Sequence, residues 1–199
     1  MKRLIPVSVL IMIILLIIYP SFADFQKGLD AYKIGDYTTV VKEWAPTAEQ
    51  DGRTLMQYDL GVIFYNGLGS VPVNYATAAK WFTLATKSGD FKSQYFMGLM
   101  HQNGQGFPAN SEIAIKWYTK SAKQGFAAAQ INLGMMYYNG IGIPKDHLRA
   151  YMWWNIFGSQ GNAEARKNRE IVEKNLSSTQ LETAQMLAKE CVKKNYKDC

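Results

Sequence analysis

The sequence predicts an all-α protein, a right-handed superhelical α-solenoid of helix-turn-helix repeats, and three recurrent features support this prediction. Tryptophans recur 37, 36 and 36 residues apart, and a glycine stands eight residues after each of them. A Gly-x-Gly motif followed by a proline recurs with the same period. Self-similarity at a fixed period of this length is typical of stacked helical pairs that bury a continuous core. The tryptophans are Trp44, Trp81, Trp117 and Trp153.

The first segment has the pattern of an export signal. Lys2 and Arg3 precede an uncharged apolar run of 16 residues, and the small residues Ser21 and Ala23 fit cleavage after Ala23. We therefore expect residues 1–23 to be a cleaved signal peptide of a periplasmic or secreted bacterial protein. The alternative is an uncleaved anchor in the inner membrane. As a helix the run would span roughly 24 Å, which is short of the ~30 Å hydrocarbon core.

Residues 24–161 are predicted to form four helical pairs. Each of the last three contains a helix A that ends at an Asn-Gly pair, a turn, and a helix B that begins after Asn74, Asn110 or Asp146 as N-cap. The first pair has no Gly-x-Gly turn, as expected of a terminal repeat with one face in water. The predicted bounds are 24–52 for the atypical first unit, then 53–89, 90–125 and 126–161.

Glycines also recur inside helix A, where each costs up to ~1 kcal/mol relative to alanine. We expect that their missing side chains let helix B approach closely. These glycines are Gly61, Gly98 and Gly134. The repeated tryptophans are expected in the core, whereas Trp154, one residue out of register, is expected to face solvent.

Residues 162–199 are predicted to be capping helices that close the solenoid. Ser177 and Gln180 form a capping-box pattern before an apolar series, which indicates the start of the last helix. Cys191 and Cys199 would lie about 12 Å apart on one continuous helix, too far for a disulfide. A bridge therefore requires the helix to end near Asn195. An oxidising compartment favours that bridge, and the alternative is free or intermolecular thiols.

The repeats resemble the Sel-one-like repeat (SLR) family, which is related to the tetratricopeptide repeats. The residues that carry the resemblance agree at fixed spacing in 56–89, 93–125 and 127–161, and 162–191 is similar to the closing helices of bacterial members. The resemblance implies an exported adaptor or scaffold that binds a protein or peptide in its concave face, without catalysis of its own.

Catalytic signatures are missing from the sequence. It contains no Gly-Lys pair of a P-loop, no G-x-S-x-G or S-x-x-K motif and no H-E-x-x-H motif. His101 is expected to replace an aromatic residue of helix A, and His147 to lie on the surface in the first turn of helix B. We therefore predict no catalytic residue, no metal site and no cofactor. The alternative function is binding or hydrolysis of peptidoglycan or a β-lactam, although the family members linked with such substrates carry a Cys pair in each repeat.

The charge distribution argues against nucleic acid as a partner. The formal net charge is +6, but residues 24–165 hold 12 basic and 11 acidic side chains. The excess lies in 166–199, where opposite charges alternate as on a solvated helix face. Partners are therefore expected to be a protein or peptide, with the cell wall as the alternative and a membrane involved only through an uncleaved first segment.

A candidate binding groove follows from helical periodicity in helix A. Relative to the helix-A glycine, positions −1, +2 and +3 form the core face, and positions −2, +1 and +5 lie together on another side. The latter combine an apolar residue at +1 with asparagines that could bond a peptide backbone. The alternative is that the +1 residues are half-buried between helices and the asparagines merely cap them. The nine residues are Asp59, Val62, Asn66, Phe96, Leu99, Asn103, Asn132, Met135 and Asn139.

Overall fold

The computed structural model describes residues 20–49, 53–196 and 199, which form helices and no strand. The prediction of an all-α repeat protein is therefore confirmed for this part of the chain. The chain folds as two compact units, Met1–Leu84 and Ala85–Cys199.

Within its described residues, 20–49 and 53–84, the first unit contains three complete helices and most of a fourth. In it α2 packs against α3 and α3 packs against α4. Val40, Trp44, Leu60 and Ile63 are buried at its centre. The helices are α2 (Pro20–Ile34), α3 (Tyr37–Ala48), α4 (Thr54–Asn66) and α5 (Tyr75–Lys87).

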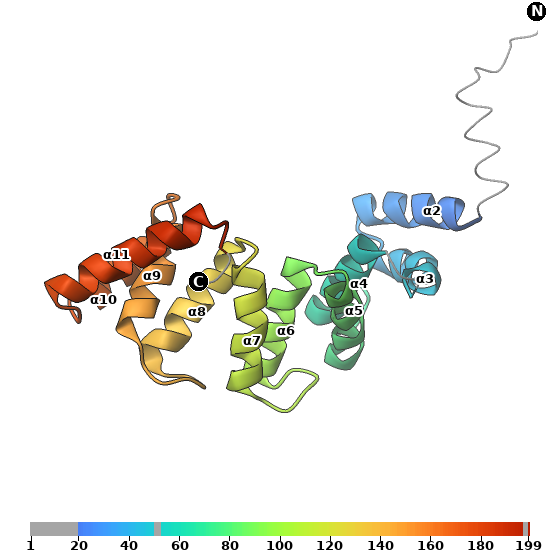
Figure 1. Ribbon diagram of the computed structural model, residues 1–199. Coiled ribbons are helices and arrows are strands. Elements are labelled where there is room, and N and C mark those ends of the chain that lie inside the picture. The colour runs from blue at the N-terminus through green and yellow to red at the C-terminus, as the bar shows by residue number, and fades with distance from the viewer. Residues whose placement is uncertain (1–19, 50–52, 197–198) are drawn as a thin grey trace, which may run out of the picture. The chain divides into compact units, whose positions relative to one another are not determined.

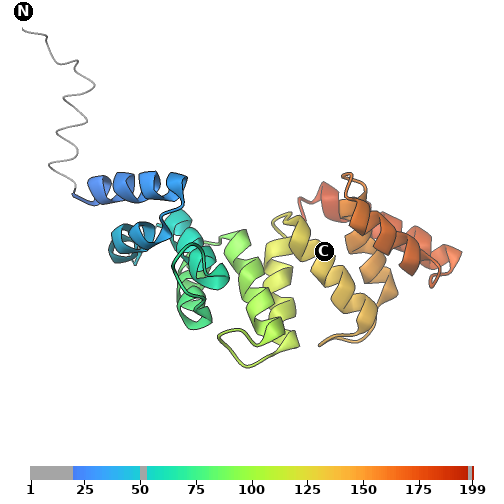
Figure 2. The ribbon, with the colours of Figure 1, turned by 180° about the vertical axis from the view of Figure 1, so that it is seen from behind.

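The second unit contains two regular helical pairs and a closing pair. Its helices α6, α7, α8 and α9 lie side by side in chain order, and α9 also contacts both α10 and α11 (Figures 1 and 2). Their bounds are α6 (Phe91–Asn103), α7 (Ser111–Ala122), α8 (Ala127–Asn139), α9 (His147–Gly158), α10 (Ala163–Glu173) and α11 (Ser178–Lys193).

The predicted turn chemistry is present at the junctions. Helix A ends in all three regular repeats at a left-handed glycine, with φ of 65° to 71° at Gly67, Gly104 and Gly140. Helix B begins where a side-chain oxygen of Asn74 or its equivalent accepts a backbone N–H three residues later, at 2.9–3.0 Å. Such a cap satisfies an amide that the helix leaves without an internal partner, so local sequence sets these boundaries.

The helix-A glycines do admit helix B closely, but the side chain that fills the space is not the repeated tryptophan. A Cβ at Gly98 would lie 2.5 Å from the Tyr118 ring, and one at Gly134 would lie 2.3 Å from Nε1 of Trp154. The contact residue is therefore the one after the repeated tryptophan. In the second unit these contacts hold α6 to α7 and α8 to α9.

The expectation that Trp154 faces solvent is wrong. The expectation that the repeated tryptophans are core residues holds for Trp44, Trp81 and Trp153, which are 2–3% exposed, but not for Trp117. Trp154 is only 2% exposed, and its Nε1 donates a hydrogen bond to the carbonyl of Ile131 at 3.1 Å. Trp44 makes the same bond to Phe25 and packs on Gly28, so it is equivalent to Trp154 and stands one residue outside the tryptophan register. Trp117 is half-buried rather than core, with a lysine ammonium 4.4 Å above its ring.

Buried glutamines form a further repeat that the sequence analysis missed. Gln57 donates to the carbonyl of Ala48 at 2.8 Å, and Gln130 donates to that of Ala122 at 3.2 Å. Each bond joins helix A to the end of the preceding helix B. Gln94, at the same register, accepts a bond from Gln124 instead. The signal was available, because these glutamines recur at intervals of 37 and 36 residues.

The closing pair has the predicted start of α11. The Ser177 hydroxyl accepts from the Gln180 backbone, and the Gln180 side chain accepts from the Ser177 backbone. Cys191 and Cys199 are joined by a disulfide with 5.3 Å between their Cα atoms, and α11 ends at Lys193, between the two cysteines. The Tyr196 hydroxyl accepts a bond from Gln160 at 3.1 Å.

Most of the predicted signal peptide, residues 1–19, lies outside the described residues. Residues 20–23 are part of the first turns of α2. Among the described residues, no helix combines the length and the apolar character needed to cross a membrane. Gly52, predicted to end the first unit, also lies outside the described residues.

Candidate functional site

Helix A of each regular repeat has a core face where the sequence analysis predicted one. Positions −1 and +2 are buried in all three repeats, and position +3 is half-buried. Packing of these side chains fixes how each helix is rotated, and it therefore determines which residues face away from the core. The buried residues are Leu60, Ile63, Met97, Met100, Leu133 and Met136.

The second unit holds six of the nine candidate groove residues. Met135 on α8 is 37% exposed, whereas Leu99 on α6 is half-buried and packs against the core. Asn103 and Asn139 are exposed. Phe96 and Asn132 are half-buried. Apolar and amide side chains therefore lie together on both helices, and the assignment of this surface to binding stays a prediction.

The asparagine amides have partners within the chain. Nδ2 of Asn139 donates to the carbonyl of Met135 at 3.1 Å, one helical turn back, and Asn66 makes the same bond to Val62 at 3.2 Å. These bonds satisfy carbonyls in the last turn of helix A, as expected if the asparagines cap the helices instead of lining a groove. Each engages the amide N–H of its asparagine, and a carboxamide also carries an oxygen that accepts hydrogen bonds.

The Tyr95 hydroxyl of α6 is influenced by side chains of α8 and α10. Burial raises its pKa, a hydrogen bond with the side chain of Asn132 on α8 lowers it, and the negative charge of Glu164 on α10 raises it. The Tyr95 ring also meets Phe96 edge-on, with centroids 5.8 Å apart.

The first unit holds the other three candidates on α4. Asp59 and Val62 are half-buried, and Asn66 is exposed. Burial raises the pKa of the Tyr32 hydroxyl on α2, and the charge of Asp59 raises it further.

Comparison with known families decides which kind of repeat this is. The Sel1 repeat matches three times, at residues 54–90, 91–126 and 127–162, which together make up more than half of the chain. The chain belongs to the Sel1 repeat family. The resemblance found in the sequence is therefore confirmed. Sel1 repeat proteins are generally non-catalytic scaffolds that bind other proteins.

Solved structures give the same fold for this Sel1 repeat protein. A Sel1 repeat protein from Oxalobacter formigenes is similar with a TM-score of 0.65 and 28% identity, over 73% of this chain and 59% of that one. The protective antigen c5321 of uropathogenic Escherichia coli strains, which displays an SLR fold, is similar with a TM-score of 0.60 and 24% identity. That match covers 88% of this chain and 47% of c5321. The chain thus spans about half the length of each relative. No curated protein matches it by sequence.

The histidines of the Sel1 repeat protein lie apart from one another. His101 on α6 stacks on Phe107 with ring centroids 4.3 Å apart, which confirms its predicted aromatic role, and burial lowers its pKa. His147 is the first residue of α9 and is half-buried against Tyr138, at 5.3 Å. No group of three metal-binding side chains occurs among the described residues.

A hollow of about 500 Å³ lies between α9 and α11, and no sequence motif indicates it. Met152 and Leu187 line it beside the Cys191–Cys199 disulfide. Its volume is that of a small-molecule site. Two charged residues of its rim are paired with each other, because Nε of Arg149 lies 3.6 Å from a carboxylate oxygen of Asp146.

Proposed function

We propose that this Sel1 repeat protein is an exported adaptor that binds an extended segment of a partner protein. The binding surface is the helix-A surface of the second unit, which comprises Phe96, Leu99, Asn103, Asn132, Met135 and Asn139. The observation that carries this proposal is Met135, a large apolar side chain 37% exposed on α8 between two asparagines. Exposed apolar groups beside hydrogen-bonding amides suit a peptide, whose backbone needs polar partners and whose side chains need apolar ones.

An extended segment fits this surface better than a helical one. An amphipathic helix presents a wide apolar stripe, with anchors at i, i+3, i+4 and i+7. Here α8 contributes the single apolar residue Met135 with an amide on either side, and α6 contributes Phe96 and Leu99 with one amide at Asn103. An extended chain also leaves its backbone N–H and C=O groups free to bond the asparagine side chains, whereas a helix uses them internally.

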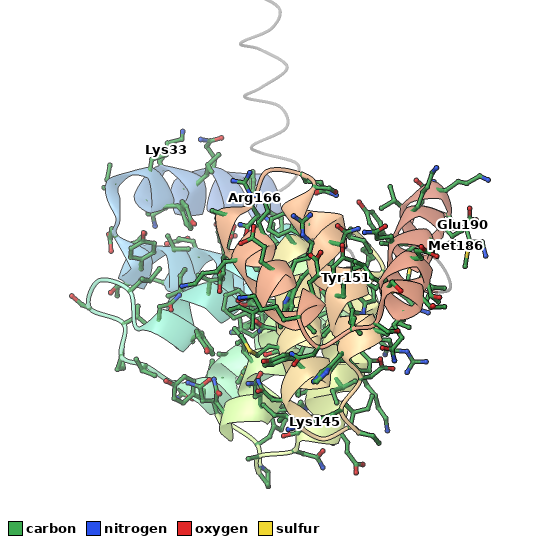
Figure 3. All side chains as sticks on the ribbon, turned by 90° about the vertical axis from the view of Figure 1, so that its left-hand side faces the viewer. Lys33, Lys145, Tyr151, Arg166, Met186 and Glu190 are labelled. Carbon is green, nitrogen blue, oxygen red and sulfur yellow. A yellow bond between two sulfur atoms is a disulfide. The ribbon has the colours of Figure 1, made fainter. Side chains whose placement is uncertain are left out.

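Site-specific photocrosslinking in the native host tests the binding surface. A crosslinking amino acid is placed at Leu99 or Met135, and the control is Met186, which is 58% exposed on the outer face of α11 (Figure 3). The expected result is one partner captured from both helix-A positions and not from position 186. Crosslinks to the same partner from all three positions, or retention of every partner by the double variant Phe96→Ala, Met135→Ala, would contradict the proposal.

Two further measurements test export and the absence of catalysis. The intact mass of the exported protein should correspond to a chain that begins at Asp24. A mass that still includes Met1 would support the membrane anchor. Turnover of peptidoglycan or of a β-lactam by the purified protein would contradict a purely adaptor role.

A further inference from the structure

Three basic side chains that form no salt bridge within the described residues lie together at the end of α9. Arg169 on α10 donates from Nη1 to Oδ1 of Asn155 on α9 at 3.2 Å. Arg166, one turn earlier on α10, packs on α9, because its Cγ lies 3.1 Å from where a Cβ on Gly158 would stand. Lys189 of α11 lines a hollow of about 280 Å³ together with Asn155. The two closing helices, which both pack on α9, therefore bring bases to one end of it.

The charge of Arg169 is only partly compensated inside the chain. A guanidinium carries five N–H donors, and the bond to Asn155 is the only one that Arg169 makes within the described residues. The side chain is half-buried, and its Nε is buried without a hydrogen-bond partner in the same part of the chain. A cation that is partly removed from water and has no anion beside it loses hydration without compensation. The site therefore favours a negatively charged group.

The acids of the closing helices stand mostly elsewhere. Glu173 and Glu182 lie near the connection between the two helices, one turn or more from the bases. Glu190 is on the side of α11 that faces away from α10 and lines the hollow beside the disulfide (Figure 3). The sequence of α9 contains no acid. Glu170 is the one acid in the same turns of α10 as the arginines, and it is exposed. The bases are therefore in excess at this end of α9.

The end of α9 does not by itself account for these bases. Cations can stabilise the C-terminus of a helix through its unpaired carbonyls. Here the chain supplies donors to these carbonyls. The Ser159 backbone N–H donates to the carbonyl of Asn155 at 3.0 Å, and the Ser159 hydroxyl donates to that of Ile156 at 2.8 Å. The Gly161 N–H donates to the carbonyl of Gly158 at 3.2 Å. The three basic groups therefore remain available to an anion from outside the chain.

We propose that this hollow and its three bases form a docking site for an acidic segment of a partner protein. A glutamate or aspartate of the segment lies between Arg169 and Lys189, where charge-assisted hydrogen bonds hold its carboxylate. An adjacent apolar residue of the segment covers Val192, which lines the hollow and is 43% exposed. This site is separate from the helix-A surface of the proposed function. Its bases lie outside the matched Sel1 repeats, which end at residue 162.

Size and charge select this occupant. The volume of about 280 Å³ is slightly below the roughly 300–1,000 Å³ of pockets that enclose a drug-sized ligand, so a single side chain of a docked segment fits it better. A free inorganic anion would meet the bases but leave the apolar side chain of Val192 uncovered. A basic segment would be repelled by three cations. The positive net charge of the whole chain, +6, also attracts an acidic partner.

The test selects random 12-residue peptides by phage display on the purified full chain. It keeps the peptides whose binding survives the double variant Phe96→Ala, Met135→Ala, and their dissociation constants are measured by fluorescence polarisation. We expect an enriched glutamate or aspartate beside an apolar residue, and a loss of affinity of about tenfold in Arg169→Gln. Lys189→Glu should weaken binding at least as much, because it also adds a repulsive charge. The affinity of the unaltered chain should fall as salt is raised.

A charge swap separates binding from folding. The peptide in which the enriched acid is replaced by lysine should bind the Lys189→Glu variant better than it binds the unaltered chain, a preference that mere destabilisation cannot produce. The controls are Lys167→Glu and Lys193→Glu, which make the same change at exposed positions of α10 and α11 outside the hollow. Neither should alter affinity by more than about twofold, the effect expected of a screened surface charge.

Three outcomes would overturn the inference. The first is that no peptide survives the double variant, and the second is that the surviving peptides are indifferent to Arg169→Gln and Lys189→Glu. The third is that free glutarate or inorganic phosphate binds as tightly as the peptides, which would assign the hollow to a small anion. In each case the proposed function stands, because it depends on Met135 and the helix-A surface instead.

Discussion

Replacing Gly134 with alanine tests the close contact between α8 and α9. A Cβ at this position would lie 2.3 Å from Nε1 and 2.6 Å from Cδ1 of Trp154. The indole is 2% exposed, and its N–H donates to the carbonyl of Ile131 at 3.1 Å. The ring therefore cannot stay where it is, and any displacement breaks a buried hydrogen bond.

Three contributions set the size of the effect. Alanine gains about 1 kcal/mol over glycine inside a helix. Forcing an extra methyl group into a packed core costs about 1–3 kcal/mol, and a buried donor without a partner costs about 1–3 kcal/mol. The net result is a loss of about 3 kcal/mol, which for a domain of this size corresponds to a melting temperature lower by roughly 10 °C.

Urea unfolding followed by circular dichroism at 222 nm measures this loss. The control is a double-mutant cycle with Trp154→Leu. The shorter leucine leaves room for the new methyl group, and it has no N–H donor that could lose its hydrogen-bond partner. In that background Gly134→Ala should cost little or become favourable. A gain of about 1 kcal/mol in the native background, the value for helix propensity alone, would refute the close contact.

Three further predictions concern other residues. Gln130→Met should change the free energy of unfolding by less than about 1 kcal/mol. Gln130 Oε1 is buried without a partner, and the carbonyl of Ala122 keeps a second donor in the Gly125 N–H. A loss above about 3 kcal/mol in urea unfolding would contradict this. Reducing the disulfide between Cys191 and Cys199, which spans 8 residues, should cost about 2.5 kcal/mol, and an unchanged melting temperature in reductant would exclude that contribution. Burial lowers the pKa of His101, so the unfolded chain binds the proton more readily. Stability should therefore fall as the pH drops through 6.5, and His101→Phe should reduce this slope in melts at pH 7 and pH 5.

Features that depend on local chemistry were predictable from the sequence. Gly67 and its equivalents adopt positive φ readily because they have no Cβ. Asn74 and its equivalents cap helix B because their short side chains reach a backbone N–H of its first turn. Both requirements are met within a few residues of the chain. The boundaries of the regular helices therefore follow from sequence motifs alone.

The environment of Trp154 depends on packing and was predicted wrongly. The tryptophan register marks Trp153, but the residue after it is the one that packs on the glycine of its own helix A, as Trp154 does at Gly134. In the structure α9 packs against α8, α10 and α11. Both Trp153 and Trp154 are therefore buried, at 3% and 2% exposure.

The packing of α10 was not evident from the sequence for a similar reason. Glu170 stands where the helix-A elements have glycine, and the connection to α11 lacks the Gly-x-Gly turn. Ala165 and Val172 are the buried residues of α10, whereas α8 buries five residues. The contacts of α10 with α9 arise from packing that no local motif specifies.

The contacts of Tyr196 influence how the second unit unfolds under mechanical force. Its ring covers Gly125, where a Cβ would lie 3.0 Å from Cε2, its hydroxyl holds Gln160, and the disulfide ties the segment to α11. In a linear array each helical pair is supported mainly by its neighbours. Tension on this unit would therefore separate its helices from α6 onward, and the closing pair of α10 and α11 would unfold last.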